Sequence, residues 1–407
     1  MTAFQQASER VDLAEVPTEP LIPPRRSNRV DELEEQIDRL RARMRIAVIY
    51  GGDKSVEGAV IHRTLNPRSW RSYQAVAEDI AESLNRLGFR HVILVPDDMR
   101  LGEVLLREGI HLAWLNTGGV QGYNPMSHAP AMLEMLGIPY IGHDSLIAGT
   151  LDNKHVFKQE LMYLGVPTAP FVTWHPARGS FRPKVNSRFL QTFKDHWGPY
   201  IVKPVSGRAS LHVHFVEEEA ELPDAVAKVY RATENHVLIE AYLPGREFCV
   251  AVGGLVVAKA RKLVRLSEPF VFAGVERRLA PGEKIFTSMD VRPITSERVR
   301  LLDPDADAAA LEQLHELARK VCIEMNLESL IRLDLRADAE GKLHVLEANP
   351  KPDLKKPTEQ ATSLVCAALP DLGMDYDDLI LSMLGDRLDL LFSQRRGTVT
   401  HLTALLE

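Results

Sequence analysis

The segment SLIRLDLRADAEGKLHVLEANP, residues 329–350, holds two runs of alternating apolar and polar residues on either side of the turn-like sequence ADAEGK. This pattern predicts a β-hairpin. If the turn is centred between its Glu and its Gly, antiparallel pairing places Asp334 opposite Glu347. The same register places Arg332 opposite Asn349. Because successive side chains alternate between the two faces of a strand, all four are expected on one face.

Two opposed carboxylates on this face create an electrostatic problem. Like charges directly across a strand pair repel each other, so a cation or a proton must lie between them. One solution is a solvated face on which Arg332 neutralises one acid, but Leu343 and Val345 would share that face and argue against free solvation. A hard divalent cation with Asp, Glu and Asn oxygen ligands fits better, and Mg²⁺ usually also takes substrate phosphates. The hairpin therefore predicts a metal site that includes Asn349 and both acids.

The bulk composition sets wide limits on the protein. The chain has 407 residues and is 45% hydrophobic, which is enough for two or three domains. A net charge of −7 and a pI near 6.1 give no basic field for nucleic acid or an anionic membrane. The three cysteines are scattered without metal spacing, so we expect a reduced cytoplasmic protein. No apolar run approaches the roughly 20 residues of a membrane span, and the acidic N-terminus does not look like a secretory signal.

The N-terminal part of the chain predicts a tail followed by a short helix. Residues 1–28 are rich in proline and polar residues and are expected to be flexible. After them, apolar residues recur with heptad spacing at Val30, Leu33, Ile37, Leu40 and Met44. Two heptads are marginal alone. The helix can therefore dock on the body of the protein or pair across a dimer, and we expect a homodimer.

From residue 45 onward the pattern changes to alternating strands and helices. RIAVIYGG, HVILVP and LAWLNTGG are expected strands, with helices around residues 71–87 and in PAMLEMLG, which predicts a mostly parallel sheet. YIVKPVSG, HVHFVEE and HVLIEAYL are expected strands of a second unit, and a third unit contains the hairpin. The predicted domains are 1–44, 45–143, 144–243 and 244–407, in an α/β (α+β) chain.

Several polar residues stand in apolar surroundings where a nucleotide could bind. Lys203 interrupts the strand PYIVKPVSG, and a buried ammonium needs an anion such as phosphate, unless the lysine snorkels from an edge strand. Glu240 ends an apolar strand, and Glu247 follows a Pro-Gly turn, where the pair could hold an adenine amino group and a ribose. The chain has neither a G-x-x-x-x-G-K-[ST] nor a G-x-G-x-x-G motif.

Taken in order, VKPVSG, VLIEAYLPGREFCVAV, the hairpin and SLVCAALPDLGMDYDDLI resemble the ATP-grasp ligases, specifically the D-alanine–D-alanine ligase branch. The resemblance runs from about residue 45 to residue 384. It implies the ATP-grasp fold, with an N-terminal α/β domain, a lid subdomain at 144–243 and a catalytic subdomain at 244–407. The two subdomains would clamp ATP between them.

The resemblance also implies a role for individual residues. Lys154 and Lys203 would bind the ATP phosphates, and Glu247 would bind the ribose. The adenine hinge would consist of Glu240, Ala241, Tyr242 and Leu243. Asp334, Glu347 and Asn349 would bind two Mg²⁺ ions, for which Mn²⁺ is an alternative. The catalytic set would be Arg332, which stabilises the oxyanion, together with Lys203 and Ser210. Ser363 and Leu364 would hold the carboxylate of the acceptor.

The sequence departs from this family where the first substrate would bind. Glu57 lies near the position of a glutamate that grips the first ammonium, but the equivalent position falls on Ala59. The loop after Asn349 is longer than in the family and carries Lys351, Lys355 and Lys356, which are either solvated or ligands of a substrate anion. Further cationic candidates are His62, Arg63, Arg68 and Arg71.

These features predict an ATP-dependent ligase that joins a carboxylate to an amine, with substrates altered from D-alanine. The reaction would pass through an acyl phosphate and release ADP and phosphate. The expected partners are a small carboxylic acid and an amino acid, without nucleic acid or membrane. Two alternatives stay open: a true D-alanine–D-alanine ligase and a nucleotide-binding regulatory protein without catalysis.

Overall fold

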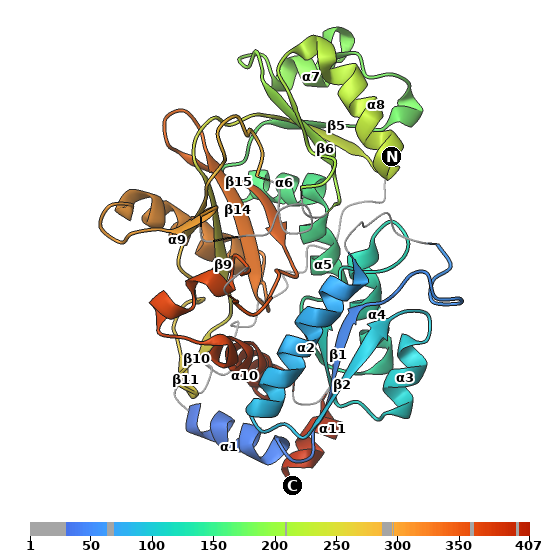
Figure 1. Cartoon of the computed structure of the whole chain (residues 1–407), viewed down its shortest axis with the longest axis vertical. Coiled ribbons are helices and arrows are strands. Elements are labelled where there is room, and N and C mark those ends of the chain that lie inside the picture. The colour runs from blue at the N-terminus through green and yellow to red at the C-terminus, as the bar shows by residue number, and fades with distance from the viewer. Residues whose placement is uncertain are drawn as a thin grey trace, which may run out of the picture.

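The computed structural model describes residues 30–62, 69–207, 210–286, 295, 297–358, 362–395 and 399–407. The predicted tail at 1–28 and two cationic candidates, Arg63 and Arg68, lie outside these residues. Within the described part, the strands form a parallel sheet of four strands, antiparallel sheets of four and five strands, and a separate two-stranded hairpin (Figure 1). No helix in this part has the length and apolar composition needed to cross a bilayer.

The first sheet is parallel and has the strand order β2-β1-β3-β4. Its strands are β1 (Arg45–Gly51), β2 (His91–Asp97), β3 (Leu112–Asn116) and β4 (Tyr140–Ile141), and its helices are α2 (Trp70–Arg86), α3 (Leu101–Arg107) and α4 (His128–Leu136). Residues 46–49 of β1 are all buried, as expected for a strand covered on both faces. The Ser69 side chain caps α2. The predicted α/β class is confirmed.

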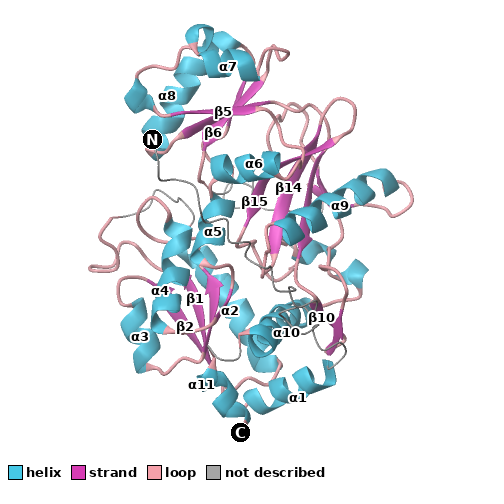
Figure 2. Cartoon of the chain, turned by 180° about the vertical axis from the view of Figure 1, so that it is seen from behind, coloured by secondary structure: helices cyan, strands magenta, loops and turns pink. Residues whose placement is uncertain are grey.

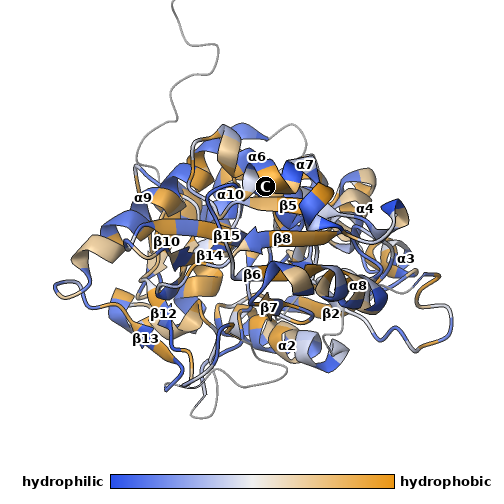
Figure 3. Ribbon diagram, turned by 90° about the horizontal axis from the view of Figure 1, so that it is seen from above, coloured by the Kyte–Doolittle hydropathy of each residue, from blue (hydrophilic) through white to orange (hydrophobic). Residues whose placement is uncertain are grey.

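The second sheet is antiparallel and has the order β5-β8-β6-β7. It consists of β5 (Phe171–Trp174), β6 (Tyr200–Pro204), β7 (His214–Val216) and β8 (Val237–Ala241), and α7 (Ser187–Thr192) and α8 (Leu222–Thr233) pack on it. Strand β8 is coloured as hydrophobic in Figure 3, and all its residues are buried. Its core is a cluster of its own, which contains residues from 172 to 241. The sheet lies at one end of the molecule (Figures 1 and 2).

The third sheet has the order β13-β12-β9-β14-β15. Its strands are β9 (Glu247–Val252), β12 (Val275–Arg277), β13 (Val299–Leu301), β14 (Ile331–Ala337) and β15 (Leu343–Asn349). Helices α5 (Ser145–Asp152), α6 (Lys154–Tyr163) and α9 (Ala308–Glu324) contribute to the core behind it. Residues 151–166 thus pack on the third sheet, although the predicted boundary assigns them to the central domain.

The hairpin of β14 and β15 has the predicted register at its functional end. Asp334 pairs with Glu347, and Arg332 pairs with Asn349. A β-bulge follows, because Leu335 pairs with Val345 and leaves Leu346 as an extra residue in β15.

The bulge makes one prediction wrong. Leu343 and Val345 do not share the face of Asp334 but lie in the core with Leu333 and Leu335. The extra residue reverses the alternation along β15, so Leu346 and Glu347 both line the opposite, polar side.

Helix α1 (Val30–Leu40) docks on the body of its own chain. Its buried residues Leu33, Ile37 and Leu40 join a core cluster that also contains α10 (Tyr376–Gln394) and the hairpin β10 (Val256–Lys259) and β11 (Lys262–Arg265). Arg39 donates to the carbonyl of Leu406, near α11 (Thr400–Thr403) at the C-terminus. The heptad seam is therefore an internal contact, and pairing of this seam across a dimer is not what the structure shows.

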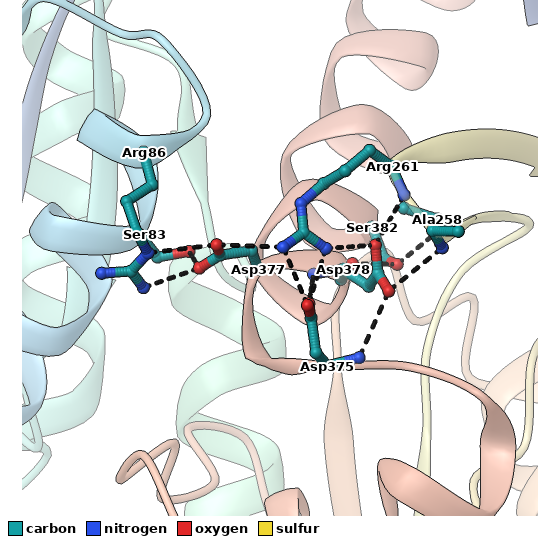
Figure 4. Close-up of polar contacts among 9 residues, drawn as sticks. Ser83, Arg86, Ala258, Arg261, Asp375, Asp377, Asp378 and Ser382 are labelled. Carbon is teal, nitrogen blue, oxygen red and sulfur yellow. Dashed lines mark hydrogen bonds and ion pairs between the residues drawn. The ribbon is translucent and has the colours of Figure 1, made fainter.

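An arginine–aspartate cluster joins the parallel sheet's helix α2 to α10 (Figure 4). Asp377 accepts hydrogen bonds from Ser83 at 2.7 Å and from Arg86 at 2.7 and 3.1 Å, both in α2. Arg261, in the turn between β10 and β11, bonds to Asp377 and Asp378. Guanidinium contacts outweigh burial and hold the pKa of Asp377 below its usual range. The N-terminal and C-terminal parts of the chain are thus joined by charge as well as by the core.

Leu40→Ala is expected to lower the free energy of unfolding by about 2–5 kcal/mol, because the side chain is fully buried and its removal leaves a cavity. Denaturant unfolding measures this loss. Glu35→Ala, on the exposed side of the same helix, is the matched control and is expected to have little effect. Light scattering should give the same solution mass for both variants. A smaller mass for Leu40→Ala with unchanged stability would contradict internal docking.

Candidate active site

One open cavity of about 950 Å³ lies between the second and third sheets. Its polar lining has five cationic and four anionic side chains: Lys154, Lys203, Arg277, Arg332, Arg336, Glu240, Glu247, Asp334 and Glu347. Its apolar lining includes Ile201, Leu211, Val213, Leu243, Phe286 and Leu346. The cavity can therefore hold a molecule with a flat apolar part and a strongly charged part.

Lys203 is buried at 5% exposure and bonds to a protein carboxylate. Its Nζ lies 2.5 Å from Oε1 of Glu240. Strand β6 runs between β8 and β7, so Lys203 does not snorkel from an edge. Burial lowers the pKa of Lys203, but Glu240 and Glu347 outweigh it, and the pKa lies above its ordinary value. The anionic partner expected for the buried ammonium of Lys203 is therefore Glu240, which lines the cavity.

Lys158 is a second buried lysine that sequence reasoning missed. Its Nζ lies 3.1 Å from Oε2 of Glu240 and 2.5 Å from the Thr168 hydroxyl. Burial lowers its pKa to about 8, although Glu240 acts in the opposite direction. Together the two lysines hold the pKa of Glu240 below its usual range against the effect of burial. Lys158 stands four residues after Lys154, a spacing that puts both on neighbouring turns of α6 and could have signalled it.

Asp334 is held by two arginines. Arg332 Nε lies 2.7 Å from Oδ1, and Arg277 Nη2 lies 2.7 Å from Oδ2. Burial raises the pKa of Asp334, but the two guanidinium groups outweigh it and hold the pKa well below its usual range. Arg277 and Arg332 thus neutralise Asp334 and reduce its expected repulsion with Glu347. The sequence analysis had considered Arg332 for this role.

Glu347 faces Asp334 across the hairpin and has a different partner. Lys154 Nζ lies 3.1 Å from Glu347 Oε2, and the carboxylate side chain keeps 26% exposure. Asn349 Nδ2 lies 3.4 Å from Asp334 Oδ2. The two predicted phosphate lysines and all three predicted metal ligands therefore line one cavity.

Glu247 binds two arginines that the sequence analysis did not identify. Arg277 Nη1 lies 2.9 Å from its Oε1, and Arg336 Nη1 lies 3.3 Å from its Oε2. Arg336 also donates to the Tyr242 hydroxyl at 2.8 Å and stacks on that ring. Arg277 ends the short strand β12 beside Glu276, and Arg336 alternates with apolar residues in β14, so neither stands out in the sequence as Lys203 does.

The predicted hinge and lid residues also line the cavity. Ala241, Tyr242 and Leu243 follow Glu240 along one wall. Ser210 lines it too, with a φ of 55°, in the left-handed region.

The donor chemistry of the hairpin fits a divalent cation that also binds phosphate. Asp334, Glu347 and Asn349 present oxygen atoms, which hard cations such as Mg²⁺ prefer. In the described part of the chain, no three His, Cys, Asp or Glu side chains group closely enough to hold a metal alone. The remaining ligands would have to come from a bound phosphate and water, as is usual for Mg²⁺.

The predicted substrate residues are more dispersed. Glu57 is exposed in the loop after β1, and the structure does not bring it to the cavity, whereas Ala59 is buried. Ser363 is fully buried, and its hydroxyl accepts a hydrogen bond from the backbone of Cys366.

Three further residues predicted to bind substrate, Leu364, Lys351 and Lys355, lie behind the third sheet or in the loop after β15. Leu364 is buried in a cluster with residues of β9 and β12. Lys351 and Lys355 are half-buried in the loop after β15, and Lys351 contacts the end of β3.

Comparison with known proteins identifies D-alanine–D-alanine ligases among the relatives of this chain. Residues 161–385, more than half of the chain, match the family model described as D-ala D-ala ligase C-terminus. A D-alanine–D-alanine ligase of Gloeobacter violaceus is 27% identical over 347 residues, covering 85% of this chain and all of that protein. A second D-alanine–D-alanine ligase, from Pseudomonas entomophila, is 28% identical over 356 residues, with 88% and 96% covered.

Two solved structures share the fold. The ATP complex of a Bacillus anthracis D-alanine–D-alanine ligase has a TM-score of 0.60 at 21% identity, covering 85% of this chain and 98% of that one. The VanG D-Ala:D-Ser ligase of Enterococcus faecalis has a TM-score of 0.61 at 17% identity, with 84% and 99% covered. These two similarities establish the arrangement of the sheets.

Proposed function

The chain belongs to the D-alanine–D-alanine ligase family of ATP-grasp enzymes, which form carbon–nitrogen bonds, and on this premise we propose that it joins a small acid other than D-alanine to an amino acid. The reaction uses ATP, passes through an acyl phosphate and releases ADP and phosphate. The observation that carries the proposal is the single cavity that contains the lysines, the hinge acid and the hairpin carboxylates.

ATP occupies this cavity with its base against the hinge. The backbone of residues 241–243 and the apolar lining hold the adenine, beside Glu240, and Glu247 binds the ribose. Lys154 and Lys203 bind the phosphates. Lys154, whose Nζ lies 3.1 Å from Glu347 Oε2, exchanges this carboxylate for a phosphate oxygen. Preorganised cations of this kind lower the repulsion that keeps a carboxylate away from ATP.

The hairpin face holds the divalent cations, and we propose two Mg²⁺ ions, with Mn²⁺ as a substitute. Asp334, Glu347 and Asn349 are their protein ligands. When bound, the cations neutralise the charge of the phosphates. The arginines that now hold Asp334 remain beside it, and Arg332 donates hydrogen bonds to the oxyanion that forms when the amine attacks the acyl carbonyl. Ser210 closes over the phosphates, and Ser363 and Leu364 position the carboxylate of the acceptor.

The exposed position of Glu57 supports substrates altered from D-alanine. A free amino acid needs an anion for its ammonium, and Ala59 cannot supply one. True D-alanine–D-alanine ligation is the second candidate, and the family membership favours it. Two predictions remain. One is a homodimer formed by a surface other than the α1 seam, and the other is a cytoplasmic location.

Turnover is expected to release ADP and phosphate in equal amounts, because an acyl phosphate forms by transfer of the γ-phosphoryl group alone. Chromatography of the nucleotides after reaction with panels of acids and amines measures this ratio, and mass spectrometry identifies the amide. Equal release of AMP and pyrophosphate would exclude the mechanism. D-alanine alone is expected to give little ADP, and abundant D-alanyl-D-alanine would establish the second candidate.

A further inference from the structure

Helix α6 lies between the second sheet and strand β15 (Figures 1 and 2). Its residue Lys158 is fully buried and does not line the cavity. The ammonium lies 3.1 Å from Glu240 Oε2, donates to the Thr168 hydroxyl at 2.5 Å and lies 5.2 Å from the centre of the Phe171 ring. Any effect of Lys158 on a molecule in the cavity must therefore pass through these neighbours.

The Thr168 hydroxyl connects Lys158 to the hairpin. It accepts the hydrogen bond from Lys158 and donates one to the carbonyl of Val345 at 2.7 Å. The N–H of Val345 donates to the carbonyl of Pro167 at 2.8 Å. Because β15 is an edge strand of the third sheet, these outward main-chain groups have no further strand of that sheet to pair with. Residues 167 and 168 thus hold β15 by both main-chain groups of Val345.

Val345 stands next to the bulge that brings Glu347 to the cavity. Asp334 pairs with Glu347, and Leu346 is the extra residue between Glu347 and Val345. A bulge sets the direction of the side chains beside it, so the position of Val345 determines where the Glu347 carboxylate lies. A continuous series of contacts therefore runs from Glu240 at the hinge, through Lys158 and Thr168, to the hairpin.

Stability is a weak explanation for this buried lysine. Moving an ammonium out of water costs free energy even beside a carboxylate, and apolar side chains in place of a buried ion pair often leave a protein equally stable. Glu240 also has Lys203 as a partner, at 2.5 Å. The positions that Lys158 fixes explain it better, because hydrogen bonds behind a binding group set the orientation of that group.

We propose that Lys158 and Thr168 are positioning residues, which hold the hinge acid Glu240 and the hairpin acid Glu347 at the separation that a nucleotide with its cation requires. The inference rests on the proposed function, because it takes the cavity to bind a nucleotide and Mg²⁺. Lys158 acts on Glu240 directly and on Glu347 through Thr168 and Val345. Loss of the Thr168 hydroxyl should therefore affect only the metal end of the cavity, whereas loss of Lys158 should affect both ends.

Calorimetric titration with ADP, once in Mg²⁺ and once in EDTA, tests the metal end. The ratio of the two affinities is the Mg²⁺ gain, and we expect the wild-type protein to bind ADP more tightly in Mg²⁺. Thr168→Val keeps the shape and removes the hydroxyl. It is expected to reduce the Mg²⁺ gain by about 2- to 10-fold, as one neutral hydrogen bond predicts, and to leave the affinity in EDTA unchanged.

Two variants control for the change at Thr168. Thr168→Ser retains the hydroxyl and is expected to keep the Mg²⁺ gain of the wild-type protein. Thr400→Val makes the same change as Thr168→Val at an exposed position of the C-terminal segment and should bind ADP as the wild-type protein does. A thermal unfolding scan shows that each variant is folded.

Lys158→Met tests both ends of the cavity, because it retains the apolar stem and removes the ammonium. It is expected to reduce the Mg²⁺ gain as Thr168→Val does. It should also weaken ADP binding in EDTA by about 2- to 10-fold, because Glu240 loses one of its two lysine partners. If Lys158→Met does not fold, the Thr168 variants decide the inference alone.

Three results would overturn the inference and leave the proposed function intact. They are a Mg²⁺ gain that Thr168→Val leaves unchanged, a gain that Thr168→Ser loses as fully as Thr168→Val, and a folded Lys158→Met variant with the gain of the wild-type protein. If Thr168→Val weakens ADP equally in Mg²⁺ and EDTA, its gain is unchanged and Thr168 only supports the fold around the cavity. A wild-type protein whose ADP affinity does not depend on Mg²⁺ would reject the proposed metal site itself, and the inference with it.

Discussion

Glu347→Gln is expected to lower turnover by about 10²–10³-fold, the usual effect of losing one transition-state electrostatic contact. The substitution keeps the size of the side chain and removes a negative charge directly opposite Asp334. Binding of the divalent cation should weaken in parallel, because a neutral amide is a poorer ligand than a carboxylate. The fold should persist, since Glu347 keeps 26% exposure and its partner Lys154 can turn to phosphate. Steady-state ADP release over a Mg²⁺ titration measures both effects.

Glu340→Gln is the matched control for this variant. It makes the same change in the same hairpin, but at an exposed turn position, and is expected to have wild-type kinetics. If Glu347→Gln also keeps near-normal turnover and Mg²⁺ dependence, the hairpin acids serve only as partners of the lysine and arginines around them.

Lys203→Met should weaken ATP binding by about 10- to 100-fold, corresponding to one lost charge-assisted hydrogen bond. The methionine retains the apolar stem in the buried strand. It also leaves Glu240 with Lys158 as its remaining lysine partner, so some loss of stability should accompany the loss of affinity. Calorimetric titration with an ATP analogue separates affinity from stability when it is compared with thermal unfolding.

Two further variants make the Lys203 result interpretable. Lys203→Met/Glu240→Gln removes both charges of the pair but leaves buried Lys158 without its carboxylate partner, so it should restore neither stability nor nucleotide affinity. Lys228→Met, on the exposed side of α8, controls for the loss of a lysine in the same part of the chain. ATP affinity that is unchanged in Lys203→Met would show that this lysine only neutralises Glu240.

The sequence predicted the hairpin register because two local rules agree, the alternation of side chains and the position of the turn. Asp334 and Glu347 are opposed as expected. The bulge at Leu346 could not be predicted in this way, because it depends on the partner segment. The N–H of Val345 donates to the carbonyl of Pro167, and the carbonyl of Val345 accepts from Thr168. Those residues are far away in the sequence, and they fix where β15 must shift.

The same limit explains which cationic side chains the sequence analysis missed. Lys203 was recognised because a lone charge in an apolar strand requires a partner. Arg277 and Arg336 do not fit that description, because each lies in a strand with other charged residues. Their role depends on Glu247 in β9 and on Asp334 in β14. Only the order of the strands in the third sheet brings these groups together.

Internal docking of α1 has a consequence for the way the chain folds during synthesis. Arg39 and Leu406 are 367 positions apart, so part of the surface that covers α1 is synthesised long after α1 itself. Until then, the apolar stripe of Leu33, Ile37 and Leu40 is exposed on a helix too short to be stable alone. Contacts this distant in sequence slow folding, and exposed apolar surface favours association with other chains or with chaperones. We expect α1 to become protected only after α10 and the residues up to Leu406 have been synthesised and have left the ribosome.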